Sequence, residues 1–191
     1  MKKFSLLLLL LISTLTCFSQ IKLEREFRIK KSEFPSEALS LIKTKLTDAK
    51  KIKFYKEIDS SKVTFEAKFK KKRLWYSVEF NEQGHLQDIE VLIKSIDIPN
   101  DTFENATKYL DQNFEKYKIV KIQQQYPVIE NDEKTINNAF QNLMLPTVNY
   151  EIMINGKKEK NFEKFEILFD ATGKFKSIRK SLPINYDHIL Y

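Results

Sequence analysis

Apolar residues recur every three or four positions in two segments of the chain, and each segment follows a proline. The first segment, over roughly residues 36–49, carries Leu39, Ile42, Leu46 and Ala49 on one helical face. The second carries Phe103, Ala106, Leu110, Phe114 and Tyr117. A proline suits the first turn of a helix, where N–H groups have no intrahelical acceptor. The pattern predicts two amphipathic helices, each of which needs a sheet to cover.

After each helix the apolar period changes from about 3.6 residues to two. Apolar residues occupy every second position from Val63 to Phe69 and again from Leu74 to Phe80, which is typical of half-buried antiparallel strands. We expect a first sheet of about four strands over 52–58, 63–69, 74–80 and 87–93. A second sheet is expected over 119–125, 149–154, 163–169 and 175–180.

Two glycines, Gly84 and Gly173, each lie four residues after a phenylalanine, where a left-handed turn can join two strands. The stretches from Pro35 to Gly84 and from Pro99 to Gly173 repeat the same order of elements, the second being about 25 residues longer. The sequence therefore predicts an α+β fold of two tandem copies of a helix packed on a four-stranded antiparallel sheet. The copies span 20–96 and 97–191, with an insertion at about 126–149 in the second.

The insertion has its own helical pattern. The tripeptide Asn131-Asp132-Glu133 precedes an apolar stripe of Ile136, Ala139, Phe140, Leu143 and Met144, which predicts a capped amphipathic helix of about three turns. Two roles remain open for this helix. It can cover one of the sheets, or it can contact a partner.

The N-terminal residues 1–19 have the features of a secretory signal peptide. Lys2 and Lys3 precede an apolar run, and small residues stand at positions −3 and −1 of a cut after Ser19. The apolar run is too short for a membrane span of about 20 residues. We expect an exported protein, periplasmic or extracellular. Lipid attachment at Cys17 is the alternative, although the residues before Cys17 depart from the usual pattern.

The amino-acid composition excludes several kinds of catalytic and metal site in the exported chain. Signal cleavage would remove two lysines and no acid, so the net charge falls from +7 to +5. It would also remove Cys17, the only cysteine, which excludes thiol nucleophiles, cysteine metal sites and disulfides. Both histidines, His85 and His188, lack a second ligand at metal spacing, and His85 is expected in a turn. We expect no catalytic site, no cofactor and no metal site.

The segment Tyr76-Ser77-Val78-Glu79-Phe80 with Gly84, and the segment Phe165-Glu166-Ile167-Leu168-Phe169 with Gly173, resemble PepSY-like domains of secreted bacterial proteins. These domains are related to the tandem modules of the β-lactamase inhibitor proteins. The resemblance covers nearly all of residues 32–181. It implies a tandem module that binds or inhibits another molecule without catalysis, and it transfers no ligand residues.

A row of carboxylates is the most unusual feature of the first predicted sheet. If the apolar alternates face the helix, each strand presents one glutamate on the opposite face, and aromatic residues lie alongside. The candidate binding surface contains Tyr55, Glu57, Glu66, Trp75, Glu79 and Glu90. Lys53 and Lys68 on the same face can offset the repulsion between neighbouring acids. The other interpretation is an ordinary solvated face with Lys–Glu pairs.

A basic run, Lys70 to Arg73, is expected at the tip of a hairpin in the first copy. Such a loop can grip nucleic acid, but export and the lack of a matching run in the second copy favour a solvated turn. We therefore expect no nucleic-acid partner. The sequence favours an exported, non-catalytic module that binds a protein partner through its outer sheet faces. The alternative is an envelope protein that binds a small ligand or a cation, such as calcium, with the carboxylate row.

Overall fold

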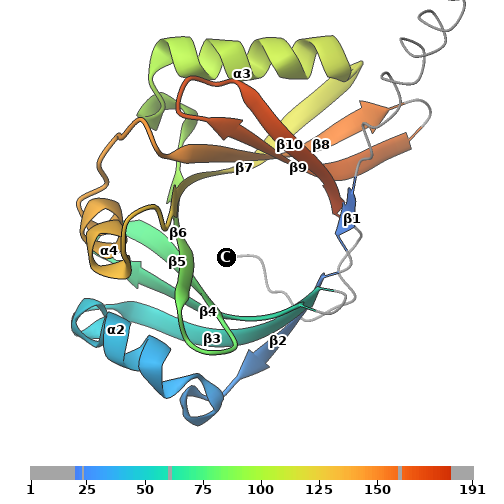
Figure 1. The fold of residues 1–191 in the computed structure, drawn as a ribbon. Coiled ribbons are helices and arrows are strands. Elements are labelled where there is room, and N and C mark those ends of the chain that lie inside the picture. Colours follow the sequence, from blue (N-terminus) through green and yellow to red (C-terminus); the bar gives the residue numbers. More distant parts are fainter. Residues whose placement is uncertain (1–19, 23, 60–61, 159–160, 182–191) are drawn as a thin grey trace, which may run out of the picture.

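The computed structural model describes residues 20–22, 24–59, 62–158 and 161–181 (Figure 1). The predicted signal peptide, Cys17 and His188 lie outside the described residues. The protein has an α+β fold, as expected. Its strands are β1 (Gln20–Lys22), β2 (Glu24–Ile29), β3 (Lys50–Asp59), β4 (Lys62–Lys71), β5 (Leu74–Asn81), β6 (Leu86–Ile93), β7 (Lys116–Pro127), β8 (Asn149–Lys158), β9 (Asn161–Asp170) and β10 (Phe175–Ser181).

Three α-helices, α2 (Ser36–Leu46), α3 (Asn100–Asn113) and α4 (Asp132–Phe140), accompany two short 3-10 helices, η1 (Lys31–Glu33) and η2 (Ser95–Asp97). Helix α2 ends three residues before Ala49, the last residue of its predicted stripe. Helix α3 ends before Phe114, which is nevertheless buried. None of the helices in the described part of the chain is long and apolar enough to cross a membrane.

All ten described strands belong to one sheet, in the order β1-β10-β9-β8-β7-β6-β5-β4-β3-β2. The expectation of two separate sheets of four strands is therefore wrong. Strand β6 pairs antiparallel with β7 from Asp88–Pro127 to Ile93–Ile122, and this pairing joins the two predicted groups of strands. The pairing has a physical reason, because separate sheets would leave both of these strands with unpaired backbone edges.

The sheet curls strongly, with its helices outside the curve (Figure 1). Strands β1 and β2 occupy opposite edges of the sheet, yet only residue 23 separates them in the chain. One intervening residue spans about 7 Å at most, so the two edges come close together. Neither edge strand was predicted, because both are short and their residues alternate weakly. The side of the sheet opposite the helices, here called the inner face, is thus surrounded by strands.

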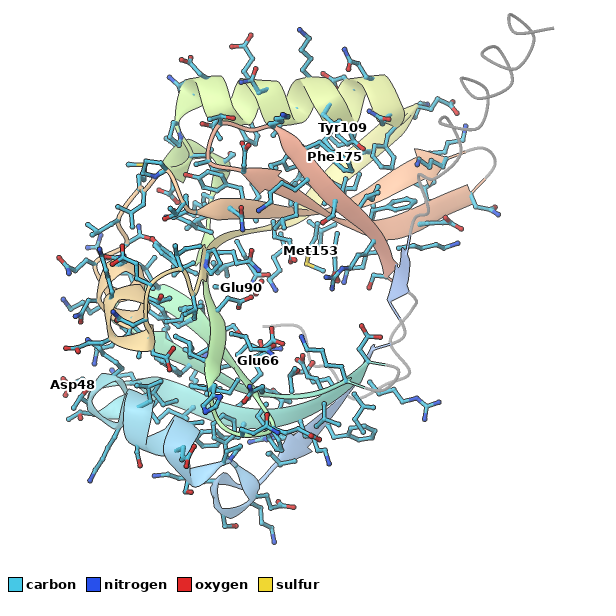
Figure 2. All side chains as sticks on the ribbon, in the orientation of Figure 1. Asp48, Glu66, Glu90, Tyr109, Met153 and Phe175 are labelled. Carbon is cyan, nitrogen blue, oxygen red and sulfur yellow. The ribbon has the colours of Figure 1, made fainter. Side chains whose placement is uncertain are left out.

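The apolar core lies between the outer face of the sheet and the helices. Ala38 and Ile42 of α2, and Ala106 and Leu110 of α3, are buried there. Aromatic rings fill much of this layer. The ring of Phe34 lies 4.8 Å from that of Phe54, and Figure 2 shows Tyr109 and Phe175, whose rings stack at 4.4 Å, between α3 and the sheet.

Helix α4 confirms the predicted helix in the insertion but is shorter. The Asn131 side chain accepts a hydrogen bond of 2.8 Å from the Lys134 N–H, which is the predicted cap. The helix ends at Phe140 because Asn142 adopts a left-handed backbone with φ of 52°. Leu143 and Met144 therefore miss the helix and are 36% and 65% exposed, which corrects the predicted stripe.

The predicted left-handed glycine turns are present. Gly84 and Gly173 both have φ of 81°. Each turn lies against the start of a helix, since a Cβ at Gly173 would lie 2.2 Å from the Thr102 carbonyl oxygen and one at Gly84 would lie 3.1 Å from the Ala38 nitrogen. These contacts tie the hairpins β5–β6 and β9–β10 to α2 and α3.

Candidate binding site on the inner face

The inner face collects the polar alternates of the central strands. In the backbone register, Tyr55 pairs with Glu66, Glu66 with Glu79, and Glu79 with Asp88. One register step away, Glu57 pairs with Thr64, and Ser77 pairs with Glu90. Alternation produces this arrangement, because it sends the residues between these positions, such as Ala67 and Val78, toward the helices. All six residues of the predicted binding surface lie on β3 to β6, and Figure 2 shows Glu66 and Glu90 on the inner side.

A lysine neutralises one end of the carboxylate row. Lys68 Nζ lies 2.8 Å from Glu26 Oε1 and 2.7 Å from Glu66 Oε2, and 4.9 Å from the centre of the Tyr55 ring. Burial alone would lower the pKa of Lys68, but Glu66, Glu26 and Glu57 together raise it. This lysine therefore stays charged, and it performs the role that the sequence suggested for it.

The pKa values of Glu66 and Glu57, two buried carboxyls near Lys68, shift in opposite directions. Burial works to raise the pKa of Glu66, but Lys68 and a hydrogen bond with Glu57 lower it below its ordinary value. Burial and the charge of Glu66 raise the pKa of Glu57 well above its ordinary range. A hydrogen bond between two carboxyl groups needs one proton, which Glu57 supplies. The Ser77 hydroxyl donates a further hydrogen bond to Glu66.

Oxygen atoms of Glu26, Glu57 and Glu66 lie within 4.8 Å of one another, the only such group of three acid, histidine or cysteine side chains among the described residues. A hard cation such as calcium prefers oxygen ligands of this kind. Here, however, the Lys68 ammonium already lies against two of the three carboxylates. The cluster is thus organised around a lysine, which speaks against the predicted cation alternative at this place.

A second acidic cluster, centred on Asp88 and Glu90 of β6, has amide donors instead of a lysine. Gln125 Nε2 donates to Asp88 Oδ2 at 2.9 Å, and Gln123 Nε2 donates to Glu90 Oε2 at 2.7 Å. Asp88 Oδ1 is buried and has no hydrogen-bond partner among the described residues. Leaving a buried acceptor unpaired costs about 1 to 3 kcal/mol.

The protonation of this second cluster differs from that of the first. Burial, followed by the charges of Glu79 and Glu151, raises the pKa of Asp88 to about 8. Burial, Glu151 and Asp88 raise the pKa of Glu90 well above its ordinary value, and Lys121 offsets this only in part. At neutral pH the cluster therefore holds protons that ordinary carboxyls would have lost.

The comparisons with known proteins bear on the fold. No protein-family model and no curated protein matches the chain. A DUF2874 family protein from Bacteroides ovatus superposes with a TM-score of 0.53 at 10% identity, over 77% of this chain and 87% of that one. A BLIP-like protein from Bacteroides fragilis superposes with a TM-score of 0.50 at 13% identity, over 82% of this chain and 92% of that one. The fold is BLIP-like.

A third structure with this BLIP-like fold comes from Bacteroides eggerthii and is provisionally described as periplasmic. It has a TM-score of 0.53 at 14% identity, over 77% of this chain and 88% of that one. At such identities the likeness establishes the fold alone. A BLIP-like fold agrees with the relation to β-lactamase inhibitor proteins that the PepSY-like resemblance implied, whereas the PepSY-like domain itself stays a prediction.

Within the BLIP-like fold, Trp75 and Leu92 lie at the same end of the inner face. The pairing of β5 with β6 extends to Tyr76–Val91, and Trp75 and Leu92 are the residues that directly adjoin this last pair. Trp75 is half-buried, with the Lys51 ammonium 5.5 Å from its ring centre, and Leu92 is 38% exposed. Trp75 faces away from the helix-covered core, as its alternation with Leu74 and Tyr76 predicts.

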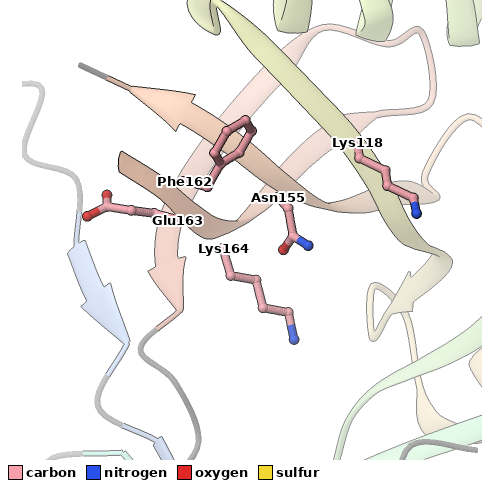
Figure 3. A pocket seen from close by; sticks show the side chains of 5 residues that line it. All are labelled: Lys118, Asn155, Phe162, Glu163 and Lys164. Atoms are coloured by element: carbon pink, nitrogen blue, oxygen red, sulfur yellow. The ribbon is translucent and has the colours of Figure 1, made fainter. Parts of the chain in front are cut away.

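The second half of the sheet has a separate hollow of about 470 Å³ on β7 to β9. Figure 3 shows its lining side chains, which are Lys118, Asn155, Phe162, Glu163 and Lys164. Glu163 pairs with Lys180 at 2.5 Å. This mixture of charges around an exposed phenylalanine resembles a surface contact area and lacks any nucleophile with an adjacent base.

The remaining sequence candidates have simple structural roles. His85 is exposed in the β5–β6 turn, where its N–H donates to Asn81 Oδ1 at 2.9 Å. Lys72 and Arg73 of the basic run form the β4–β5 turn, with Lys72 in a left-handed conformation of φ 53°, and Lys70 and Lys71 end β4. Both findings match the solvated turns expected from the sequence.

Several residues of the inner face were missed. Asp88 has the same strand parity as Glu90, so alternation could have found it. Glu151 alternates with Tyr150 and Ile152 in the same way. Glu26 lies on the unpredicted strand β2, and the sequence has no signal that places it beside Glu66.

Proposed function

We propose that this protein is a non-catalytic binding module of the cell envelope, which receives a segment of a protein partner on the inner face of its sheet. One observation carries the proposal. All three described α-helices lie on the outer face, so the structure concentrates polar, charged and aromatic side chains on a face that its own helices do not cover (Figure 1). Groups with strongly perturbed pKa values cluster at functional sites, and Asp88 and Glu90 are such groups.

The location in the cell envelope rests on the sequence and on the neighbours. Residues 1–19 have the composition of a signal peptide, and the mature chain needs no cysteine. A structure with the same fold is provisionally described as periplasmic. A BLIP-like fold also fits an inhibitory or scaffolding role, since the PepSY-like domains that the motifs resemble are related to the modules of the β-lactamase inhibitor proteins.

We also infer that the chain arose by duplication of a PepSY-like unit, at 20–96 and 97–191. The inference is supported by the paired elements around the two glycine turns. Pro35 and Pro99 precede α2 and α3 with similar backbone angles, of φ −55° and −53°. Gly84 and Gly173 have the same φ, and each lies against the first turn of its helix. The segment between β7 and β8, which contains α4, distinguishes the second unit.

Site-specific photo-crosslinking in intact cells tests the function. A benzophenone amino acid at Leu92 reports on the inner face, and one at Lys108, exposed on α3, is the matched control on the outer face. We expect a discrete protein adduct from position 92, lost when Trp75→Ala is added, and none from position 108. An adduct from position 108 alone would show that the helical face binds the partner and would reject the proposal.

A further inference from the structure

The two acidic clusters of the inner face differ in how their charge is balanced. In the first, Lys68 lies within 2.8 Å of two carboxylates. In the second, the groups that contact Asp88 and Glu90 are neutral amides, those of Gln125 and Gln123. Neutral donors stabilise a carboxylate less than a cation does. Within the described part of the chain, the second cluster therefore lacks a contacting cation such as the one that Lys68 provides in the first cluster.

A relay of hydrogen bonds fixes the orientation of the amide at Asp88. Lys176 Nζ donates to Asn149 Oδ1, and Asn149 Nδ2 donates to Gln125 Oε1, both at 2.9 Å. Gln125 must then direct its N–H₂ group at Asp88 Oδ2, at 2.9 Å. The amide is held in place and cannot turn to serve the other oxygen, Asp88 Oδ1, which is buried without a partner among the described residues.

We propose that the cluster around Asp88 and Glu90 binds a cationic side chain, lysine or arginine, carried by an extended segment of the partner protein. This inference rests on the proposed binding function and names the chemistry of the occupant. Charge complementarity supports it, because an ammonium or guanidinium supplies both the missing charge and a donor for Asp88 Oδ1. The ordered amides on the other side of the carboxylates make the site selective for a donor group.

The apolar neighbours suit the stem of such a side chain. Trp75 and Leu92 lie next to the Ser77–Glu90 pair, toward one end of β5 and β6, and Leu92 is exposed there. Lysine and arginine bury their methylene stems along apolar surface while the charged head reaches a polar group. A segment that enters from this end can place a stem against these two residues and its head between Glu90 and Asp88.

A metal ion fits the second cluster poorly. Calcium takes six to eight oxygen ligands, whereas Gln123 and Gln125 direct N–H groups, not oxygens, at the carboxylates. The grouping of three carboxyls within 4.8 Å occurs only at Glu26, Glu57 and Glu66 among the described residues. A donor-rich cation on a flexible stem matches the second cluster better than a bare ion does.

Binding should be coupled to proton release. The charged groups that act on Asp88 and Glu90 come from four strands: Glu66 on β4, Glu79 on β5, Lys121 on β7 and Glu151 on β8. Burial and the acids raise the pKa of Asp88 to about 8, and a bound cation lowers it. Since the bound form requires ionised Asp88, affinity should rise with pH from 6 to about 8 and then level off.

The test is a titration of the full mature chain with a lysine-containing pentapeptide that is blocked at both ends, followed by NMR shifts and calorimetry. The matched probe carries acetyllysine instead. We expect the lysine peptide to bind, to release protons at pH 7, and to bind about tenfold or more weakly to Asp88→Asn. The control variant is Glu163→Gln, which removes the ion pair with Lys180 at the hollow on β7 to β9. It should bind the lysine peptide as tightly as the wild type does.

Three outcomes would overturn the inference. Equal binding of the acetyllysine peptide, or no binding of the lysine peptide, shows that charge is not recognised. Calcium chloride that shifts the same resonances and raises the melting temperature, with both effects lost in Asp88→Asn, assigns the site to a metal. A dimer that Asp88→Asn dissociates assigns it to a second copy of the chain. A surviving crosslink at Leu92 would then keep the binding function while removing the cationic occupant.

Discussion

Replacing Asp88 by asparagine should stabilise the unliganded protein, although it removes a charged residue from a sheet. The carboxyl of Asp88 has a pKa raised to about 8 in the folded chain, and burial is the main cause. In the unfolded chain the pKa returns to about 3.9. Folding at neutral pH therefore requires this carboxyl to take up a proton, which opposes folding.

The magnitude follows from the two pKa values. Stability from this group is complete below about pH 4 and is lost as the pH rises toward the folded pKa of about 8. Each pH unit between these limits costs about 1.4 kcal/mol, so the upper limit at pH 7 is about 4 kcal/mol. Relaxation of neighbouring groups reduces this figure, and we expect Asp88→Asn to gain about 1 to 3 kcal/mol at pH 7.

Urea unfolding of the wild type and Asp88→Asn at pH 4, 6 and 8 measures the effect. The two proteins should be nearly equal at pH 4, and the variant should gain steadily as the pH increases. Glu163→Gln is the control with the opposite sign, because it breaks a half-exposed pair with Lys180 and should cost at most about 1 kcal/mol. A variant that is less stable than the wild type at pH 8 would refute the assignment of a protonated Asp88.

Three further changes test other parts of the structure. Lys68→Met should destabilise by about 2 kcal/mol or more, because Glu66 loses its cation, and Glu66→Gln in the same chain should recover part of the loss in urea melts. Gly173→Val should lower the melting temperature more than Gly84→Val does. A Cβ at position 173 would lie 2.2 Å from a carbonyl oxygen, whereas one at position 84 would lie 3.1 Å from an amide nitrogen. Equal losses of melting temperature in the two variants would contradict this. Asn131→Ala should cost about 1 kcal/mol through loss of the α4 cap, whereas Asn131→Asp should cost little.

The local elements were predictable because short-range pattern determines them. Alternation between Val63 and Phe69 identified β4 and its inner face, and the glycine at 84 identified the turn that follows β5. The side on which Glu66 and Glu90 lie follows from the same alternation. These features depend on periods of two or 3.6 residues and on a single left-handed position, all of which are visible in the sequence.

Long-range pairing was not predictable in the same way. Nothing in the residues 87–93 or 119–125 indicates that the two strands join, because any antiparallel edge can accept another. Strand β2 contributes Glu26 because β3, which follows α2 in the chain, comes back to pair with β2 at the edge of the sheet. The role of Lys68 was foreseeable from its face, whereas its contact with Glu26 was not. Sequence thus indicated which side chains share a face but not which of them become buried together.

The unusual protonation of Asp88 and Glu90 depends on the joining of the two groups of strands. Had β6 been the edge of a separate four-stranded sheet, its inner side chains would lie beside water and their carboxyls would ionise normally. Instead β7 pairs with β6 and brings Gln123 and Gln125 against both acids, while Glu151 of β8 adds its charge. The site therefore belongs to neither half of the chain alone. The cluster around Asp88 and Glu90 forms because β7 and β8 follow β6 in one continuous sheet and cover the edge that β6 would otherwise leave open.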